Sequence, residues 1–523
     1  MRRLAWLCLF VLFLAFNVSA SEQSEVGEVL FANSGSPAAQ GPFLRGLALL
    51  HNFEYLSAAE QFRKAQTIDP DFAMAFWGEA MTYNHPVWML QDLAAARAVL
   101  GRLGATPEAR LAKAKTERER DYLRALEVLY GDGTKEERDF HYADAMAALH
   151  QRYPDDVDAT AFYSLSLLGT AHHGRDFAIY MRSAALLEEV FPTHSHHPGV
   201  LHYLIHSYDD PIHAPLGLRA ARLYGSVAPN AGHALHMTSH IFVAVGQWDD
   251  VIAANEQALR VVDQHRADQR KPPRACGHYA SWLHYGYLQE RRLGDARRQL
   301  DACRQMAVRE VAGSPEGDDS LVSSFAEMRL FQGIETGRWE TDPLALPEGR
   351  FLDARFILAY GETLAAASGD RPALRAAAAR LRERQRELLA EIAKEKQNVT
   401  VDRSYAEVVV QQIDALEQIR EGKADEGFAA LRNVAERESA LPMEFGPPAI
   451  QKPSSELLGD ELIALGRNAE AEQAYQSALA RAPGRTLSLQ GLLRAQQALG
   501  KTEAAGRTRA QLQQYVRPAP ATR

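Results

Sequence analysis

Residues 196–206 read HHPGVLHYLIH, and residues 232–242 read GHALHMTSHIF. Each segment contains one pair of histidines four residues apart: His202 with His206, and His236 with His240. Residues four apart on a helix share one face, so each pair predicts two imidazoles on the same side. The two pairs are 34 residues apart, which is a period of helical-hairpin repeats. The spacing therefore places equivalent pairs on neighbouring, parallel helices of a repeat array.

Landmarks of a helical-hairpin repeat recur elsewhere in the chain. Such a repeat needs small residues where two helices approach, aromatic residues between the helices, and proline where the second helix ends. The first unit carries them at Gly46, Tyr55, Ala58, Phe62, Ala65 and Pro70. The last two units carry them at Gly459, Gly466, Ala471, Tyr475, Ala478, Pro483, Gly500 and Ala505. The chain thus resembles the tetratricopeptide-repeat superfamily, most strongly over residues 39–106, 161–305 and 452–519.

This resemblance implies an all-α fold, a tetratricopeptide-like helical-hairpin solenoid that winds into a right-handed superhelix. The segments HHPGVLHYLIH, APNAGHALHMTSHIF and EFGPPAIQKPSSELLG also resemble those of a recurring subgroup of exported bacterial proteins in this superfamily. The resemblance implies a fold and no particular chemistry, because one fold supports many functions.

The chain of 523 residues is expected to divide into four parts. They are a signal peptide at 1–20, an N-terminal repeat array with a histidine-rich concave groove at 21–310, less regular helical hairpins at 311–450, and a C-terminal repeat pair with a tail at 451–523. The first part has a basic start, an apolar segment and a small-residue cleavage site, as secretory signals do. Its apolar segment is too short to span a membrane. We therefore expect an exported protein, periplasmic or secreted, with no transmembrane segment in the mature chain.

Charge and cysteine content narrow the functional classes. The net charge is −9 at pH 7 and no basic stretch stands out, which argues against a nucleic-acid partner. The sequence contains no nucleotide-binding motif, nucleophile elbow or organic-cofactor fingerprint. Cys276 and Cys303 remain after the signal and flank one predicted hairpin. An exported protein can oxidise such a pair, so a disulfide and two buried thiols both fit the sequence.

Histidines concentrate at particular places of the repeat. Stacked hairpins line a concave groove with the first helix of every unit, and the resemblance implies that places two, five, nine, twelve and thirteen of a unit face this groove. When each register is set without using histidine, ten of the 18 histidines fall on those places, whereas chance would put about three there. The ten are His51, His85, His172, His173, His202, His206, His233, His236, His240 and His278.

A groove lined with histidine predicts a transition-metal site. Imidazole is a common ligand of zinc, copper and iron, and four imidazoles from two adjacent helices can reach one ion. Asp209 or Asp210 can add a carboxylate or orient an imidazole, and His233 and His278 can widen the site or hold a second ion. The histidine pairs lack the glutamate of a zinc-peptidase motif. The predicted metal ligands are His202, His206, His236, His240, His233, His278 and Asp209.

Three functions are compatible with this pattern. The preferred one is an exported binding or scaffold protein that has a metal site in its concave groove and holds a protein or peptide partner there. The second is a metalloenzyme whose ion activates water or oxygen over a peptide or small substrate. The third is a metal-free interaction scaffold in which the histidines pack, or line a groove that binds peptide, carboxylate or phosphate. The sequence names neither the metal nor the partner.

Overall fold

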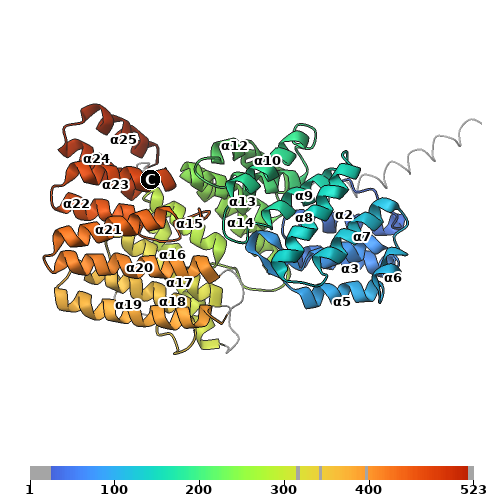
Figure 1. Ribbon diagram of the computed structural model, residues 1–523, viewed down its shortest axis with the longest axis horizontal. Helices are drawn as coiled ribbons and strands as arrows, with labels where there is room; N and C mark the ends of the chain where they lie inside the picture. Colours follow the sequence, from blue (N-terminus) through green and yellow to red (C-terminus); the bar gives the residue numbers. More distant parts are fainter. Residues whose placement is uncertain (1–24, 314–318, 341–343, 395–398, 516–523) are drawn as a thin grey trace, which may run out of the picture. The chain divides into compact units, whose positions relative to one another are not determined.

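The computed structural model describes residues 25–313, 319–340, 344–394 and 399–515. The predicted signal peptide, residues 1–20, lies outside the described residues. The described residues form 24 α-helices, α2 to α25, with two short 3₁₀ helices and one two-stranded sheet (Figure 1). Most helices that follow one another in the sequence pack against one another. The predicted all-α solenoid of helical hairpins is confirmed.

The chain forms two compact units. Unit 1 holds the described residues up to Asp209 together with Leu216–Thr238, and unit 2 holds Asp210–Pro215 and the residues from Ser239 onward. The division predicted at residues 310 and 450 concerned the regularity of the repeats and stays a prediction.

Unit 1 contains ten complete α-helices and the small sheet. Its elements are η1 (Pro37–Ala39), α2 (Gln40–His51), α3 (Tyr55–Ile68), α4 (Ala73–Met81), β1 (Asn84–His85), η2 (Pro86–Trp88), β2 (Leu90–Gln91), α5 (Leu93–Leu103), α6 (Pro107–Leu111), α7 (Glu117–Leu129), α8 (Lys135–Arg152), α9 (Val157–Leu168), α10 (Phe177–Val190) and α11 (Pro198–Tyr208). The strands pair antiparallel, with Asn84 opposite Gln91. The helices α12 (Ala214–Val227) and α13 (Gly232–Val245) belong partly to each unit.

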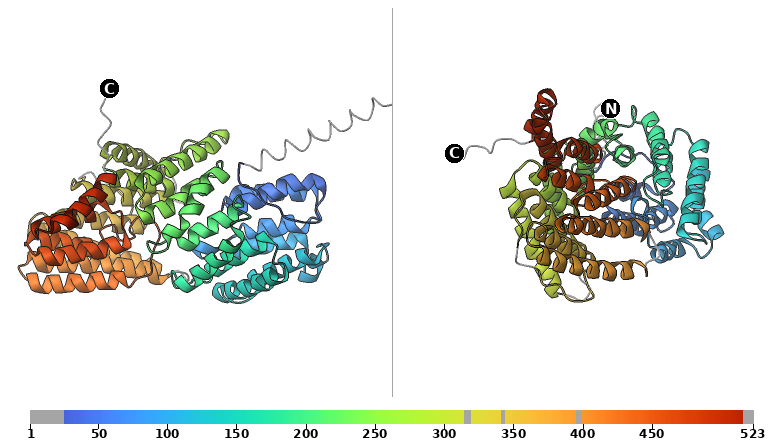
Figure 2. Two further views of the ribbon diagram at one scale, coloured as in Figure 1. Left: turned by 90° about the horizontal axis from the view of Figure 1, so that it is seen from above. Right: turned by 60° about the vertical axis from the view of Figure 1, so that its left-hand side comes forward.

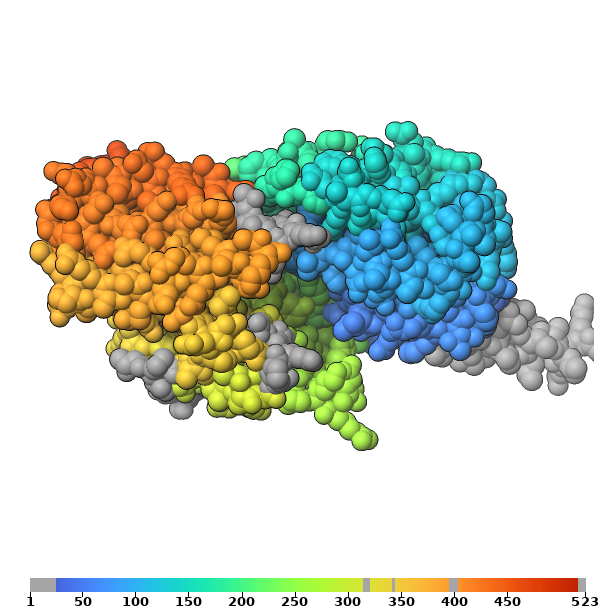
Figure 3. Space-filling model, turned by 60° about the horizontal axis from the view of Figure 1, so that its bottom comes forward, coloured from blue at the N-terminus to red at the C-terminus, as the bar shows by residue number. Residues whose placement is uncertain are grey.

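Unit 2 contains the remaining twelve helices. They are α14 (Trp248–Asp268), α15 (His278–Gln289), α16 (Leu293–Gly313), α17 (Asp319–Thr336), α18 (Leu352–Ala366), α19 (Arg371–Ile392), α20 (Val399–Arg420), α21 (Ala424–Ser439), α22 (Ser454–Ala464), α23 (Asn468–Arg481), α24 (Thr486–Ala498) and α25 (Thr502–Tyr515). From α19 to α25 they stack in sequence order, orange to red in both views of Figure 2. The side chains of α19 and α20 form part of the packed outer surface seen in Figure 3. No helix among the described residues is both long and apolar enough to cross a bilayer.

The small and aromatic landmarks pack as the repeat pattern predicts. A Cβ atom added at Gly46 of α2 would lie 3.0 Å from the ring of Phe62 on α3, and one added at Gly78 of α4 would lie 2.3 Å from the same ring. Near the other end of the chain, the Tyr475 ring lies in the same way between Gly459 and Gly491, at 2.8 and 2.2 Å. Each aromatic ring therefore fills a notch between two glycines, and any larger residue there would push the helices apart.

Within unit 2, the beginning of α24 contacts α14 and α15. The indole N–H of Trp248 donates to the carbonyl oxygen of Gly484 over 2.9 Å. Thr486 bonds to Gln289 through its backbone N–H and its hydroxyl, at 2.8 and 2.7 Å. These contacts join segments about 200 residues apart, so the last repeats are anchored to the first helices of the unit.

A buried ion-pair cluster stabilises this contact. The guanidinium of Arg485 is buried, and it lies 2.6 Å from the carboxylate of Glu456 and 3.2 Å from that of Glu335. It also donates to the hydroxyl of Tyr285 over 3.0 Å. A buried charge needs such partners, because removing it from water costs several kcal/mol.

A disulfide joins Cys276, just before α15, to Cys303 on α16, with 4.5 Å between the two Cα atoms. Of the two states that the sequence left open, the structure therefore contains the bonded one. The bond holds the start of α15 against α16 within unit 2.

Candidate metal centre

The turn between α2 and α3 positions the candidate site. Phe53 lies in this turn with a left-handed backbone, φ 57°, which costs a non-glycine residue about 1–2 kcal/mol. The turn leaves the carbonyl oxygen of His51 at the end of α2. This oxygen accepts a hydrogen bond from Nδ1 of His202 over 2.6 Å. A helix end that leaves its last carbonyls without helical partners thus becomes a fixed acceptor for an imidazole from α11.

Three histidines of unit 1 come together beside this turn. His202 and His206 lie one turn apart on α11 and are 0% and 2% exposed, and their ring centroids are 4.8 Å apart. The ring of His233, in the first turn of α13, lies 5.1 Å from that of His202. One ring nitrogen from each of the three lies within 4.8 Å of the other two. We call His202, His206 and His233 the histidine triad.

The hydrogen bond to His51 decides which nitrogen of His202 carries the proton and which carries the lone pair. A carbonyl oxygen only accepts hydrogen bonds, so Nδ1 of His202 carries the proton. In a neutral imidazole the other nitrogen, Nε2, then has the lone pair. Metal-binding histidines commonly have this arrangement, with one ring N–H held by a backbone carbonyl and the other nitrogen bound to the ion.

Aromatic rings enclose the histidine triad. The ring of Phe53 lies 4.2 Å from that of His202 and 5.7 Å from those of His206 and His233. The indole of Trp88, in the 3₁₀ turn between the two strands, lies 6.0 Å from the ring of His233. An apolar wall of this kind limits access of water and strengthens the interaction of neutral imidazoles with a cation.

Two acidic residues of unit 1 adjoin the segments that carry the histidine triad. Glu54, next to Phe53, accepts a hydrogen bond from the backbone N–H of His233 over 3.0 Å and so fixes the start of α13. Asp209, which the sequence predicted as a ligand, lies at the end of α11 and is 1% exposed. No sequence signal pointed to Glu54, because its partner is 179 residues away.

The other predicted ligands have different neighbours. His236 is buried on α13, and its ring lies 6.2 Å from that of His233. In unit 2, the ring of His240 packs against Trp282 at 4.3 Å and lies 6.4 Å from the ring of His278. The structure thus brings His202 and His206 together with His233, and His240 together with His278.

Asp210, the second acidic candidate, has a local structural role. Its Oδ1 accepts the backbone N–H groups of Ile212 and His213 at 3.0 and 3.1 Å, and its carboxylate lies 2.9 Å from Nδ1 of His213. These contacts close the turn that leads into α12, as a short acidic side chain often does at a helix start.

A second buried cluster lies in unit 1, and we call it the aspartate network. It consists of His51, Asp158 at the start of α9, and His197 at the start of α11. Oδ1 of Asp158 lies 2.9 Å from Nε2 of His51 and 3.3 Å from Nε2 of His197. The sequence pointed to His51 alone, since nothing in the chain near Asp158 resembles a site.

The protons of the aspartate network are all accounted for. Burial opposes ionisation of Asp158, but hydrogen bonds from His197 and His51 hold the pKa of its carboxyl well below the usual value. Both imidazoles therefore donate Nε2–H to a carboxylate. Nδ1 of His197 accepts from the backbone N–H of Val200 over 3.4 Å, and Nδ1 of His51 accepts from the hydroxyl of Tyr203 over 3.0 Å. Burial lowers the pKa of His51 to about 4, so this ring is neutral at pH 7.

The remaining groove histidines lie apart from both clusters. The ring of His85 stacks on that of Tyr55 at 4.0 Å. Nε2 of His172 lies 3.0 Å from a carboxylate oxygen of Asp139, and His173 is exposed. The histidines that the sequence placed on the groove therefore have several different kinds of neighbours in the structure.

Comparison with known proteins adds similarity in fold only. No family model and no curated protein matches the chain. The chain is similar to the APC/C hetero-tetramer Cut9–Hcn1, at 12% identity over 94% of this chain and 82% of that chain, with a TM-score of 0.32. It is also similar to the TPR domain of P58(IPK), at 12% identity over 89% of this chain and 99% of that chain, with a TM-score of 0.22. TM-scores this low support no further conclusion. The assignment of the fold is based on the helix packing described above.

Proposed function

We propose that this protein is an exported binding protein that holds a transition-metal ion, zinc, copper or iron, at the histidine triad. The observation that carries the proposal is the hydrogen bond from Nδ1 of His202 to the carbonyl of His51, next to two further buried imidazoles. This bond orients a ligand nitrogen before any metal arrives. Asp209 is the carboxylate proposed to complete or orient the site.

The wider histidine set is part of the same proposal. His236 and His240 would extend the site along α13, and His278 would join His240 in a second position. The partner proposed for the groove of the repeat array is a protein or peptide, because solenoids offer extended surfaces of this kind. Export is supported by the disulfide between Cys276 and Cys303, since such bonds persist in oxidising compartments.

Metal content tests this function directly. The mature protein, purified without a histidine tag, is compared with a triple variant, His202→Ala, His206→Ala and His233→Ala. A matched control replaces three exposed histidines, His141, His173 and His194, with alanine. We expect near-stoichiometric metal by mass spectrometry in the wild type and the control, and almost none in the triple variant. Failure of the wild type to bind zinc, copper or iron after loading would refute the site.

A double variant tests whether His236 and His240 also bind the metal. The variant His236→Ala with His240→Ala should lose metal if the ion is shared by all four histidines that the sequence singled out. Retention of one ion per chain in this variant would restrict the proposal to the histidine triad.

The alternative function is a metalloenzyme. The number of histidine ligands in the triad supports this alternative. Catalytic zinc sites have three protein ligands and one position for water or substrate, whereas structural sites are closed by four. The histidine triad supplies three. Cobalt(II) substitution separates the two cases: added azide should shift the visible spectrum if a position is open, and an unchanged spectrum would favour the binding protein.

A further inference from the structure

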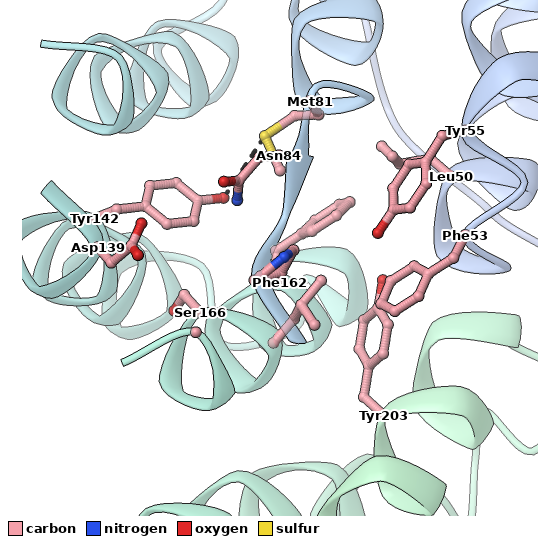
Figure 4. Close-up of a pocket in the computed structure, with 13 residues that line it drawn as sticks. Leu50, Phe53, Tyr55, Met81, Asn84, Asp139, Tyr142, Phe162, Ser166 and Tyr203 are labelled. Carbon is pink, nitrogen blue, oxygen red and sulfur yellow. Dashed lines mark hydrogen bonds between the residues drawn. The ribbon is translucent and has the colours of Figure 1, made fainter. Parts of the chain in front are cut away.

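Unit 1 contains a narrow pocket that the metal proposal does not use. Residues of α2, α3, α4, α8, α9 and α11 line it, and its free space holds about one water-sized group. Phe53 and Phe162 form apolar walls, and the phenol rings of Tyr55, Tyr142 and Tyr203 complete the enclosure (Figure 4). Burial raises the pKa of these three phenols, which therefore stay neutral.

Three hydroxyl groups at the pocket already donate their protons to other residues. The hydroxyl of Tyr142 donates to the sulfur of Met81 over 3.9 Å, as the dashed line in Figure 4 shows. The hydroxyl of Tyr203 donates to Nδ1 of His51, and that of Ser166 donates to the carbonyl of Tyr163 over 2.7 Å. Each of these oxygens keeps its lone pairs for another donor.

A buried carboxylate adds negative charge to the same lining. Asp139 is 5% exposed, and both of its basic neighbours, Lys135 and His172, contact Oδ2 rather than Oδ1. Burial raises the pKa of the Asp139 carboxyl, and Lys135 and His172 oppose this shift. Asp139 therefore lines the pocket with a buried carboxyl group that two basic side chains contact.

One more polar atom lies at this pocket. The hydroxyl oxygen of Tyr55 is buried and has no hydrogen-bond partner among the described residues, and Figure 4 shows it directed into the enclosed space. A buried hydroxyl without a partner costs about 1–3 kcal/mol, so a ligand that bonds to it gains affinity. It can accept a hydrogen bond as well as donate one.

We propose that this pocket binds a primary alkylammonium group. An ammonium has three N–H donors and no acceptor, which complements a lining of hydroxyl and carboxylate oxygens. Its positive charge suits Asp139 and the surrounding aromatic rings. The terminal –NH3+ group is about the size of a water molecule, as the free space requires, whereas a quaternary ammonium head is larger and has no N–H group. The proposal is independent of the histidine triad.

The methyl group of Met81 is a reporter inside the pocket. Metal-free protein labelled at its methionine methyl groups is titrated with n-butylammonium chloride at constant ionic strength, and the Met81 signal is assigned with Met81→Leu. We expect a saturable shift of this signal by NMR. The neutral analogue 1-butanol and the quaternary ion tetramethylammonium should each bind at least tenfold more weakly. Equal binding of either one, or no shift with n-butylammonium, would overturn the proposal.

Two substitutions test the contribution of charge at the pocket separately from its shape. Asp139→Asn keeps the size of the side chain and should weaken butylammonium binding at least tenfold, whereas Lys135→Gln removes a competing cation and should tighten it. Unchanged affinity in both variants would overturn the assignment. If Asp139→Asn does not fold, two measurements still test the proposal. They are the comparison of the three probes on the wild type and the affinity of Lys135→Gln for butylammonium.

Two further probes separate the sources of the ammonium group. 1,5-Diaminopentane represents a free polyamine, and Nα-acetyl-lysine-N-methylamide represents a lysine side chain of a peptide. Tighter binding of the diamine would assign a small polyamine ligand, and tighter binding of the lysine derivative would assign a peptide. Failure of both to bind would contradict the proposal.

Discussion

The histidine triad and the aspartate network are two buried clusters of unit 1 that look alike by distance. In each, three candidate ligand atoms lie within 4.8 Å of one another. They differ in where the protons lie. Both imidazoles of the aspartate network donate Nε2–H to Asp158 and accept at Nδ1, so their lone pairs already have donors. In the triad, His202 donates at Nδ1 and has its lone pair at Nε2.

This difference separates a structural cluster from a candidate site. A metal at Nε2 of His197 would require a proton on Nδ1, where the backbone N–H of Val200 already donates. The same requirement is met in His202 by the carbonyl of His51. Proximity of histidines alone therefore does not identify a metal site, and the hydrogen bond on the far side of each ring does.

The largest expected effect concerns the aspartate network. Asp158→Ala removes two charge-assisted hydrogen bonds and leaves two buried N–H groups without a partner. The free energy of unfolding of unit 1 should fall by about 4 kcal/mol, measured by urea titration of the metal-free protein. The exposed residue Asp155 provides the control, and Asp155→Ala should change little. An Asp158→Ala variant of wild-type stability would show that the network does not hold unit 1 together.

Acidification should break the same network. The pKa of His51 is about 4 in the folded protein and 6.5 for the free side chain, so the unfolded chain binds the proton more readily between these values. The resulting stabilisation is complete above pH 6.5 and is lost as the pH falls towards 4, by about 3 kcal/mol. Urea midpoints of metal-free protein at pH 7 and pH 4.5 measure it. A His51→Gln variant with the same pH dependence as the wild type would contradict this assignment.

Metal should stabilise the protein through the histidine triad. At a free-metal concentration 100 times the dissociation constant, binding adds about 2.7 kcal/mol to the free energy of unfolding. The melting temperature of the wild type should therefore fall when a chelator is added. The variant lacking the histidine triad should melt at one temperature with and without chelator. A chelator effect that persists in that variant would place the metal elsewhere.

The smallest expected effect tests whether the histidine triad and the aspartate network act independently. Tyr203→Phe removes the hydroxyl that donates to Nδ1 of His51 and should cost about 1 kcal/mol of stability. Metal content should not change, because the carbonyl of His51 still fixes His202. Loss of metal from Tyr203→Phe, measured by mass spectrometry, would show that the two clusters act as one site.

The fold was predictable because each landmark acts locally. Gly46 and Phe62, or Gly459 and Tyr475, belong to one hairpin and reveal it by spacing alone. The pair His202 and His206 followed from helical periodicity for the same reason.

The parts of the site that the sequence did not predict depend on contacts between distant hairpins. Glu54 reaches His233 across 179 residues, and Asp158 reaches His51 across 107. The left-handed turn at Phe53 has no sequence signal either, because such turns usually contain glycine or asparagine. The proton positions in His51, His197 and His202 followed only from hydrogen-bond partners that the structure places beside their rings.

Anomalous diffraction tests the central claim most directly. Crystals of the mature protein loaded with zinc would be measured on both sides of the zinc absorption edge. The account predicts one strong anomalous peak about 2.0–2.1 Å from ring nitrogens of His202, His206 and His233, with Nε2 as the ligand of His202. A peak beside Asp158 between His51 and His197, or no peak in unit 1, would contradict it.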